Sequence, residues 1–198
     1  RRVLFRSKMV GFNIPSTLIT NKKKDLFDFY NICNKKIITK PIKNSLFIQD
    51  ENHLEFGKHT FIITNEEIQI LDSIFNLGLF QEYIQKKFEI RVFVFSEKIY
   101  SMAIFSQNNV NTQVDYRNYD HEKPNRCVPY NLPNTIKRKI FKFMKYKKID
   151  TGSIDIIFST NNKYFFLENN PQGQFDWLSK NCNYNIEKEI AEILISQI

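Results

Sequence analysis

The sequence predicts an α+β fold in two lobes, because helical and strand-like apolar patterns follow one another along 198 residues without a low-complexity linker. Hydrophobic residues make up 42% of the chain and aromatic residues 15%, a composition typical of a folded globule rather than a disordered chain. We expect a smaller lobe over residues 1–79 and a larger lobe over residues 80–198. The chain opens at Arg1 inside an amphipathic helical pattern, so we also expect a missing N-terminal part.

The smaller lobe is predicted to mix helices with short strands. In order, we expect a helix that ends near Gly11, a turn at Pro15, a helix from about Lys24, a strand over 36–41, a polar hairpin-like stretch through Asp50 and His59, and a strand over 61–64.

The larger lobe is predicted to contain two hairpins and two helices. In order, we expect an apolar segment over 80–84, a hairpin over 89–105 that turns at Ser96 and Glu97, a polar loop through Asp120, a basic helix over 135–147, a hairpin over 152–174, and a last helix from Ile186 with Ile190, Ile193 and Leu194 at core spacing.

The net charge of +8 is compatible with a protein that binds nucleic acid, but much of that charge lies on the helix over 135–147. Its apolar stripe is formed by Ile136, Ile140, Phe143 and Met144, and lysines occupy the other faces. Because no nucleic-acid recognition signature accompanies it, we expect no nucleic-acid partner. A basic surface also suits nucleotide phosphates or acidic peptides.

The sequence gives no sign of a membrane span, a secretory signal or a disulfide framework. No apolar run approaches the roughly 18 residues that a transmembrane helix needs. The three cysteines, Cys33, Cys127 and Cys182, show no C-x-x-C spacing, which argues against a zinc site. We therefore expect a cytoplasmic protein with no membrane partner.

The hairpin over 152–174 places two carboxylates opposite each other. A two-residue type I′ turn at Asn161 and Asn162 would pair Thr160 with Lys163. Counting back along both arms then sets Asp155 opposite Glu168, with Asn170 on the same face. Like charges directly opposite each other destabilise a sheet.

A divalent cation would remove this conflict. Mg²⁺ is held by one or two carboxylates and an amide oxygen, with positions left for water and phosphates. We therefore predict that Asp155, Glu168 and Asn170 bind a nucleotide-associated Mg²⁺. The alternative is a solvated surface hairpin with an acid on each arm. The strongly apolar neighbours of both acids favour the metal site.

Six short motifs occur in one order along nearly the whole chain. They are Ile37-Ile38-Thr39-Lys40, Phe80-Gln81-Glu82-Tyr83-Ile84, Glu89-Ile90-Arg91, Asp115-Tyr116-Arg117, Gly152-Ser153-Ile154-Asp155 and Glu168-Asn169-Asn170-Pro171. This order resembles the ATP-grasp superfamily. The resemblance implies an ATP-grasp fold, in which two α+β lobes grip the nucleotide between antiparallel sheets.

A closer resemblance is to the graspetide-forming peptide maturases of the microviridin and grasp-with-spasm type. It is carried by Asn125-Arg126, Val128-Pro129-Tyr130, Leu132-Pro133, and residues 167–175 with Trp177. This resemblance implies an ATP-dependent ligase that activates Asp or Glu side chains of a ribosomal precursor peptide as acyl phosphates. A Thr, Ser or Lys side chain of the same peptide then closes an ω-ester or ω-amide macrocycle. The expected partners are this peptide and a second copy of the chain in a homodimer.

The resemblance also implies roles for single residues toward ATP. Lys40 would reach the phosphates; Gln81, Glu82, Tyr83 and Ile84 would read the adenine edge; Glu89 would bind the ribose hydroxyls. Taken alone, Lys40 would be a solvated strand-end lysine and both glutamates ordinary surface acids. Arg91 would either pair with a carboxylate inside the lobe or contact phosphate.

Two arginines are the expected catalytic residues. Arg117 matches the family arginine near the γ-phosphate and acyl phosphate, and Arg126 is the candidate for gripping the acidic substrate side chain. Arginine suits both tasks because its planar fork binds carboxylate and phosphate bidentately.

The sequence departs from the family pattern in three places. The stretch 43–59 contains one glycine, Gly57, where many relatives have a glycine-rich phosphate loop. Gln107 stands near a position that is basic in some relatives, and the preceding N-terminal domain, with a lysine just before the first helix, is absent from this sequence.

Two other functions stay open at this point. One is an ATP-grasp ligase for another carboxylate and amine, such as a glutamate or amino-acid ligase. The other is a non-enzymatic basic binding module, which would bind independently of Mg²⁺ and weaken steeply with salt.

Overall fold

The chain folds into two compact units of mixed α and β structure. The computed structural model describes residues 2–41, 48–49, 55–56, 60–118 and 120–196. Unit 1 comprises Arg1–Ile14, Gln85–Asn109 and Glu122–Ile198, and unit 2 comprises Pro15–Ile84 and Val110–His121. The expected single division after residue 79 differs from these boundaries, because residues 1–14 belong with the C-terminal unit and residues 80–84 and 110–121 with the other.

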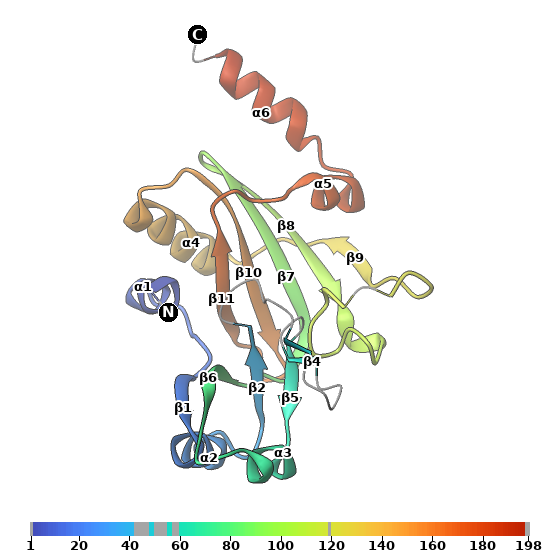
Figure 1. Ribbon diagram of the computed structural model, residues 1–198. Helices are drawn as coiled ribbons and strands as arrows, with labels where there is room; N and C mark the ends of the chain where they lie inside the picture. Colours follow the sequence, from blue (N-terminus) through green and yellow to red (C-terminus); the bar gives the residue numbers. More distant parts are fainter. Residues whose placement is uncertain (1, 42–47, 50–54, 57–59, 119, 197–198) are drawn as a thin grey trace. The chain divides into compact units, whose positions relative to one another are not determined.

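Unit 1 is built on a five-stranded antiparallel sheet in the order β11-β10-β7-β8-β9 (Figure 1). Its strands are β7 (Lys86–Phe95), β8 (Lys98–Phe105), β9 (Arg126–Pro129), β10 (Thr151–Ser159) and β11 (Tyr164–Asn170). Its helices are α1 (Arg2–Met9), α4 (Asn134–Lys147), α5 (Asp176–Cys182) and α6 (Ile186–Ile195), with a short 3₁₀ helix, η1 (Ser106–Asn108). The predicted hairpin turn at Ser96 and Glu97 is confirmed, since Phe95 pairs with Lys98.

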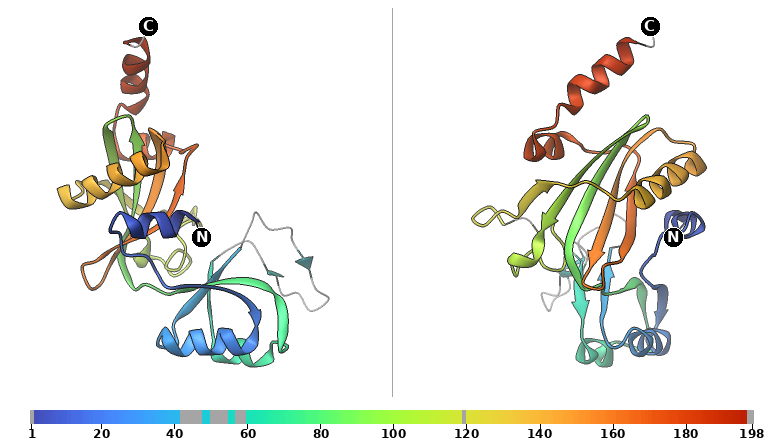
Figure 2. Two further views of the ribbon diagram at one scale, coloured as in Figure 1. Left: turned by 90° about the vertical axis from the view of Figure 1, so that its left-hand side faces the viewer. Right: turned by 180° about the vertical axis from the view of Figure 1, so that it is seen from behind.

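Helix α4 covers one face of this sheet, as the two views in Figure 2 show. Its buried stripe is the predicted one, formed by Ile136, Ile140, Phe143 and Met144. From the sheet, the core receives Ile90, Val92, Val94, Ile154, Ile156 and Phe166. Because side chains alternate along a strand, the residues between these core positions point to the opposite face.

Unit 2 is built on a four-stranded antiparallel sheet in the order β1-β6-β2-β5. Its elements are β1 (Thr17–Lys22), α2 (Lys23–Ile32), β2 (Ile37–Lys40), the short pair β3 (Ile48–Gln49) and β4 (Glu55–Phe56), β5 (Phe61–Ile63), α3 (Asn65–Ile70) and β6 (Ile74–Glu82). Helices α2 and α3 pack on one face through Leu26, Tyr30 and Ile68, against Ile37, Ile63 and Phe80 of the sheet.

Several elements differ from the sequence-based expectation. Strands β1 and β9 and helix α5 were not predicted. Helix α6 begins at Ile186 as expected, but Ile186 alone of its predicted stripe is fully buried, and Leu194 is 52% exposed. Most of the stretch 43–59, including Gly57, lies outside the described residues.

None of the helices in the described segments has the length and apolar character needed to cross a membrane.

Candidate functional site

The β10–β11 hairpin of unit 1 turns through three residues rather than the predicted two. The amide of Asn162 donates to the Ser159 carbonyl at 3.0 Å, and the amide of Ser159 donates to the Lys163 carbonyl at 2.9 Å. Asn162 adopts a left-handed conformation with φ of 57°, and Asn161 does not. This is a turn of three residues closed by a left-handed residue, so the type I′ prediction was wrong.

A β-bulge at Leu167 restores the predicted pairing of the acids. Close to the turn, Phe158 pairs with Tyr164 and Ile156 with Phe166; the register then shifts, and Asp155 pairs with Glu168. Phe166 faces the α4 core. In a regular strand Glu168, two residues on, would face the same core. The extra residue turns Glu168 to the face of Asp155 and keeps Phe166 buried.

Asp155 forms a buried ion pair with Arg91 on the neighbouring strand. The two residues pair directly across β7 and β10. The Nη1 atom of Arg91 donates to Asp155 Oδ1 at 2.9 Å and to Oδ2 at 3.0 Å. The side chains are 8% and 11% exposed. Of the two roles considered for Arg91, the structure therefore shows the pairing with a carboxylate inside the unit.

This ion pair changes the reasoning about the metal. The sequence predicted an electrostatic conflict between Asp155 and Glu168 that a divalent cation would relieve. Arg91 already supplies a positive charge at Asp155, so the charge of this acid is offset without a metal ion. The metal prediction consequently rests on the donor atoms themselves.

These donor atoms fit a hard divalent cation. Two carboxylates and an amide oxygen are the ligands that Mg²⁺ prefers. Asn170 ends β11 and pairs with Ser153, and its Oδ1 accepts a 3.1 Å hydrogen bond from the amide of Gln172, which fixes the side chain. Among the described residues, no three His, Cys, Asp or Glu side chains gather to hold a metal, so the set needs Asn170 and oxygens from outside the chain.

Glu89 lies on the same face of β7, two residues before Arg91. Its Oε1 accepts from Lys86 Nζ at 2.5 Å, and its Oε2 accepts from the Ser106 hydroxyl. Glu89 and Lys86 are each 5% exposed. Sequence reasoning did not single out Lys86 or Ser106, because their meeting depends on the bulge beside Lys86 and on the turn into η1. The ribose role of Glu89 stays a prediction.

Lys40 and Gln81 share the face of the unit 2 sheet that is turned away from helices α2 and α3. Ile38 pairs with Gln81 and Lys40 with Leu79, whereas Ile37 and Phe80 face the helices. As predicted, Lys40 is the last residue of its strand. This arrangement puts an ammonium group and an amide on one side of one sheet.

Gln81 is a buried polar residue of the unit 2 sheet. Its side chain is 3% exposed, and its Nε2 donates to Thr17 Oγ1 at 3.0 Å. Its Oε1 is buried and has no hydrogen-bond partner among the described residues. A buried acceptor without a donor costs about 1–3 kcal/mol. The exocyclic amine of an adenine is a donor of the kind this oxygen accepts from, and the adenine role of Gln81 stays a prediction.

Glu82, Tyr83 and Ile84 follow at the end of the first segment of unit 2, Pro15–Ile84. Glu82 Oε2 accepts a 3.1 Å bond from the amide of Ser16, and the amide of Tyr83 donates to the Lys36 carbonyl at 3.0 Å. Ile84 is buried. The Glu82 carboxylate thus has a structural contact within the unit, and the roles of these three residues toward adenine stay predictions.

Arg117 is held by Asp115 in a bidentate pair. Its Nε and Nη2 atoms donate to the two Asp115 oxygens at 2.9 and 2.7 Å, and Thr60 Oγ1 donates to Oδ2 at 2.8 Å. Burial alone would raise the pKa of Asp115, but the hydrogen bonds and charge of Arg117 hold that pKa well below its usual range. The Arg117 side chain remains 55% exposed, which leaves part of the guanidinium accessible to a ligand.

Arg126 opens β9 in unit 1. Its guanidinium lies 5.3 Å from the centroid of the Phe105 ring, and the residue is exposed. Gln107 follows shortly after Phe105, and its Nε2 lies 3.4 Å from Ser106 Oγ. The contact of Arg126 with Phe105 orients the guanidinium without neutralising its charge, so it stays available for an acidic group.

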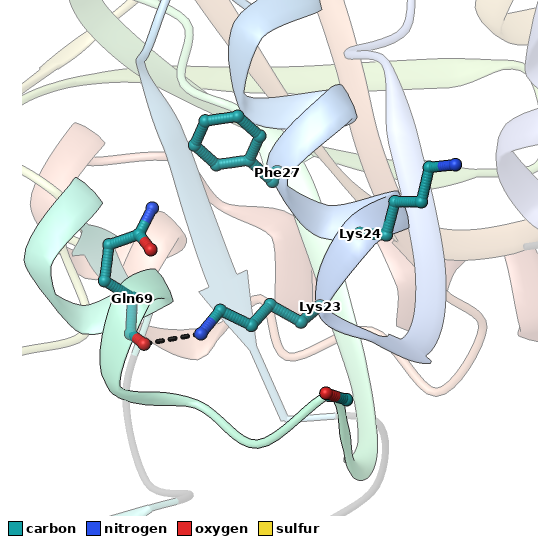
Figure 3. Close-up of a pocket in the computed structure, with 5 residues that line it drawn as sticks. Lys23, Lys24, Phe27 and Gln69 are labelled. Atoms are coloured by element: carbon teal, nitrogen blue, oxygen red, sulfur yellow. Dashed lines mark hydrogen bonds between the residues drawn. The ribbon is translucent and has the colours of Figure 1, made fainter.

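A pocket of unit 2 lies beside helices α2 and α3 (Figure 3). It is lined by Lys23, Lys24, Phe27, Gln69 and Ser73, none of which is a predicted site residue. Lys23 Nζ donates to the carbonyls of Gln69 and Leu71 at 2.5 and 3.0 Å. This lysine therefore caps the carbonyl groups at the C-terminal end of α3.

The two antiparallel sheets with their helices define a protein of the ATP-grasp fold. The sequence model of the RimK-like ATP-grasp domain matches residues 2–194. The chain therefore belongs to the RimK-like ATP-grasp family. No curated protein sequence matches it.

Solved structures of related proteins agree with this assignment. Macrocyclase MdnC from Microcystis aeruginosa, bound with precursor peptide MdnA, is 33% identical with a TM-score of 0.80, over 100% of this chain and 61% of that one. A RiPP-associated ATP-grasp ligase of Chryseobacterium gregarium, in complex with ADP and a leader and core peptide, is 26% identical with a TM-score of 0.85, over 100% of this chain and 62% of that one.

A third structure shares the fold alone. ATP-grasp ligase PsnB, complexed with minimal precursor, Mg and ADP, is 18% identical with a TM-score of 0.74, over 98% of this chain and 56% of that one. The chain thus spans about three fifths of the length of each of these three structures.

Proposed function

We propose that the chain forms the ATP-grasp part of an ATP-dependent ligase that closes rings in a ribosomal precursor peptide. The enzyme would activate Asp or Glu side chains of the peptide and join them to Thr, Ser or Lys side chains as ω-esters or ω-amides. A homodimer and a cytoplasmic location stay predictions. Light scattering on the purified protein would measure its oligomeric state.

The observation that carries this proposal is the Asp155–Glu168 pair beside Asn170, in a chain 33% identical to a peptide macrocyclase. The pair exists because a bulge overrides the alternation of β11, at the cost of a regular strand. Bulges of this kind are frequent next to active sites, where they re-aim a side chain.

Nucleotide contacts are proposed for each unit by itself. In unit 2, the orphan oxygen of Gln81 would accept from the adenine amine, beside the backbone groups of Glu82, Tyr83 and Ile84, and Lys40 would contact the phosphates. In unit 1, Glu89 would bind ribose, and Asp155, Glu168 and Asn170 would hold Mg²⁺. When bound, Mg²⁺ offsets charge on the phosphate oxygens during transfer.

The reaction itself needs positioning and charge neutralisation more than a protein nucleophile. A substrate carboxylate oxygen attacks the γ-phosphorus, and ADP leaves, which gives an acyl phosphate. A hydroxyl or amine of the same peptide then attacks the acyl carbon, loses its proton, and expels phosphate. Arg126 would orient the acidic side chain, and the exposed edge of Arg117 would bind the transferred phosphoryl oxygens.

Calorimetry of ATP binding tests the nucleotide half of the proposal. Binding should require Mg²⁺ and should be lost in Glu168→Gln, whereas Asp176→Asn serves as a matched control because its side chain is 70% exposed and outside the cluster. If ATP does not bind, or if binding is unchanged without Mg²⁺ and in Glu168→Gln, the ATP-grasp ligase function is refuted. Binding of nucleic acid or acidic peptide that falls steeply with salt would then favour the basic module.

Mass spectrometry of a precursor peptide tests the substrate half. With a peptide containing repeated Thr and Asp or Glu residues, each ring closed should remove one water. Formation of ADP with a free amino acid or glutamate as acceptor, and no ring in the peptide, would replace the macrocyclase by an amino-acid ligase.

A further inference from the structure

Arg91 occupies an unusual position for a basic residue, because its buried guanidinium binds the carboxylate that is expected to bind the metal ion. Both Asp155 oxygens accept from one nitrogen, Nη1, at 2.9 and 3.0 Å. We propose that Arg91 is a positioning residue: it is a built-in counter-ion that holds Asp155 in place without a metal, and it makes tight metal binding depend on the nucleotide.

The charges on this face of the sheet support the first half of the proposal. Asp155 stands directly between Arg91 on β7 and Glu168 on β11. Glu89, the next acid along β7, binds Lys86. On the β8 side, Arg91 pairs with Met102, which carries no charge. The arginine thus neutralises a buried acid that stands beside the exposed acid Glu168 in the sheet.

The geometry supports the second half. Each oxygen of Asp155 already accepts a charge-assisted hydrogen bond from Arg91, so a cation at Asp155 must use the remaining lone pairs. It must also approach a fixed positive charge, which weakens binding of the bare ion. Nucleotide phosphates bring negative charge to the same place and offset that repulsion. The part of this inference that concerns the nucleotide rests on the proposed function, and the part that concerns the bare metal does not.

Titration with Mn²⁺ alone, followed by electron paramagnetic resonance, tests the proposal on the full-length protein. In Arg91→Met, Mn²⁺ should bind about tenfold tighter than in the wild type, a modest part of the Coulomb interaction of two charges a few ångströms apart near a protein surface. Arg91→Lys keeps the charge and should bind Mn²⁺ like the wild type. Arg138→Met, an exposed arginine on α4, is the matched control and should change nothing.

Thermal unfolding gives a second readout that does not depend on activity. The Tm of Arg91→Met should be lowered in EDTA and recovered in part by MgCl₂, because the cation replaces the missing counter-ion. The wild-type Tm should barely respond to MgCl₂ alone.

Three results would overturn the proposal: Mn²⁺ binding no tighter in Arg91→Met than in the wild type, equal binding in Arg91→Lys and Arg91→Met, or an Arg91→Met protein that is equally unfolded in EDTA and in MgCl₂. None of these measurements involves ATP. A protein that passes them and yet fails to bind nucleotide would refute the proposed function and leave the counter-ion role of Arg91 intact.

Discussion

Glu168→Gln and Asp155→Asn remove one negative charge each from the same cross-strand pair, yet they should affect stability in opposite directions. Glu168 is exposed at the surface of β11, whereas Asp155 is 8% exposed and binds Arg91. Removing Glu168 relieves repulsion between like charges, which is worth about 0.2–1 kcal/mol across a strand pair. Removing the Asp155 charge breaks the buried ion pair with Arg91, at a cost of about 3–5 kcal/mol.

Urea denaturation in EDTA at pH 7 measures this contrast. Glu168→Gln should unfold at the same urea concentration as the wild type or a slightly higher one, and Asp155→Asn should unfold at a clearly lower one. Asp176→Asn again serves as the control. Equal loss of stability in the two variants would show that Arg91 does not neutralise Asp155, and an unchanged midpoint for Asp155→Asn would show that the ion pair contributes no stability.

Four further substitutions test the stability of the two units. Asp115→Asn should lower the free energy of unfolding by about 1.5–3 kcal/mol at pH 7, because the charged hydrogen bonds to Arg117 are lost. Since the pKa of Asp115 is lowered in the folded state, this loss should shrink as pH falls below about 4. Urea titrations at several pH values measure it. Gly173→Ala should cost about 1–2 kcal/mol in backbone strain at φ of 40°, with an added clash at 3.0 Å from the Ser153 amide. Gly11→Ala, strained but with its nearest contact at 3.6 Å, should cost less, as a comparison of denaturation midpoints would show. Lys23→Met should weaken α3 by about 0.3–1 kcal/mol through lost contacts with its terminal carbonyls, seen as faster amide hydrogen exchange in that helix.

The sequence predicted elements whose signal lies in local periodicity. The stripe of α4 and the two-residue turn between β7 and β8 were confirmed because each depends on residues close in the chain. Strand β1 was missed because its six residues, mostly half-buried or exposed, lack a clear alternating apolar pattern. The exposed end of α6 was misjudged because periodicity shows which face is apolar and not whether anything covers it.

Hydrogen-bond and ion-pair partners that are far apart in the sequence could not be predicted from it. Thr60 and Asp115, 55 residues apart, share a buried hydrogen bond that fixes the acid beside Arg117, and no spacing rule connects them. The cluster of Lys86, Glu89 and Ser106 has the same character. The Arg91 pair was partly anticipated, because pairing with a carboxylate inside the lobe was one of the two roles considered for this arginine, beside contact with phosphate. Which carboxylate it was depended on the alignment of β7 with β10.

The hairpin of β10 and β11 shows how a correct pairing was reached through an incorrect turn. A two-residue turn at Asn161 and Asn162 and a regular ladder would align Asp155 with Glu168, as would a three-residue turn followed by one extra residue at Leu167. The two solutions differ in what they do to Phe166. In the regular ladder Phe166 and Glu168 share a face, so the strand would have to expose the aromatic ring or bury the acid. The bulge separates them, and this separation lets one short strand serve the apolar core on one side and the carboxylate pair on the other.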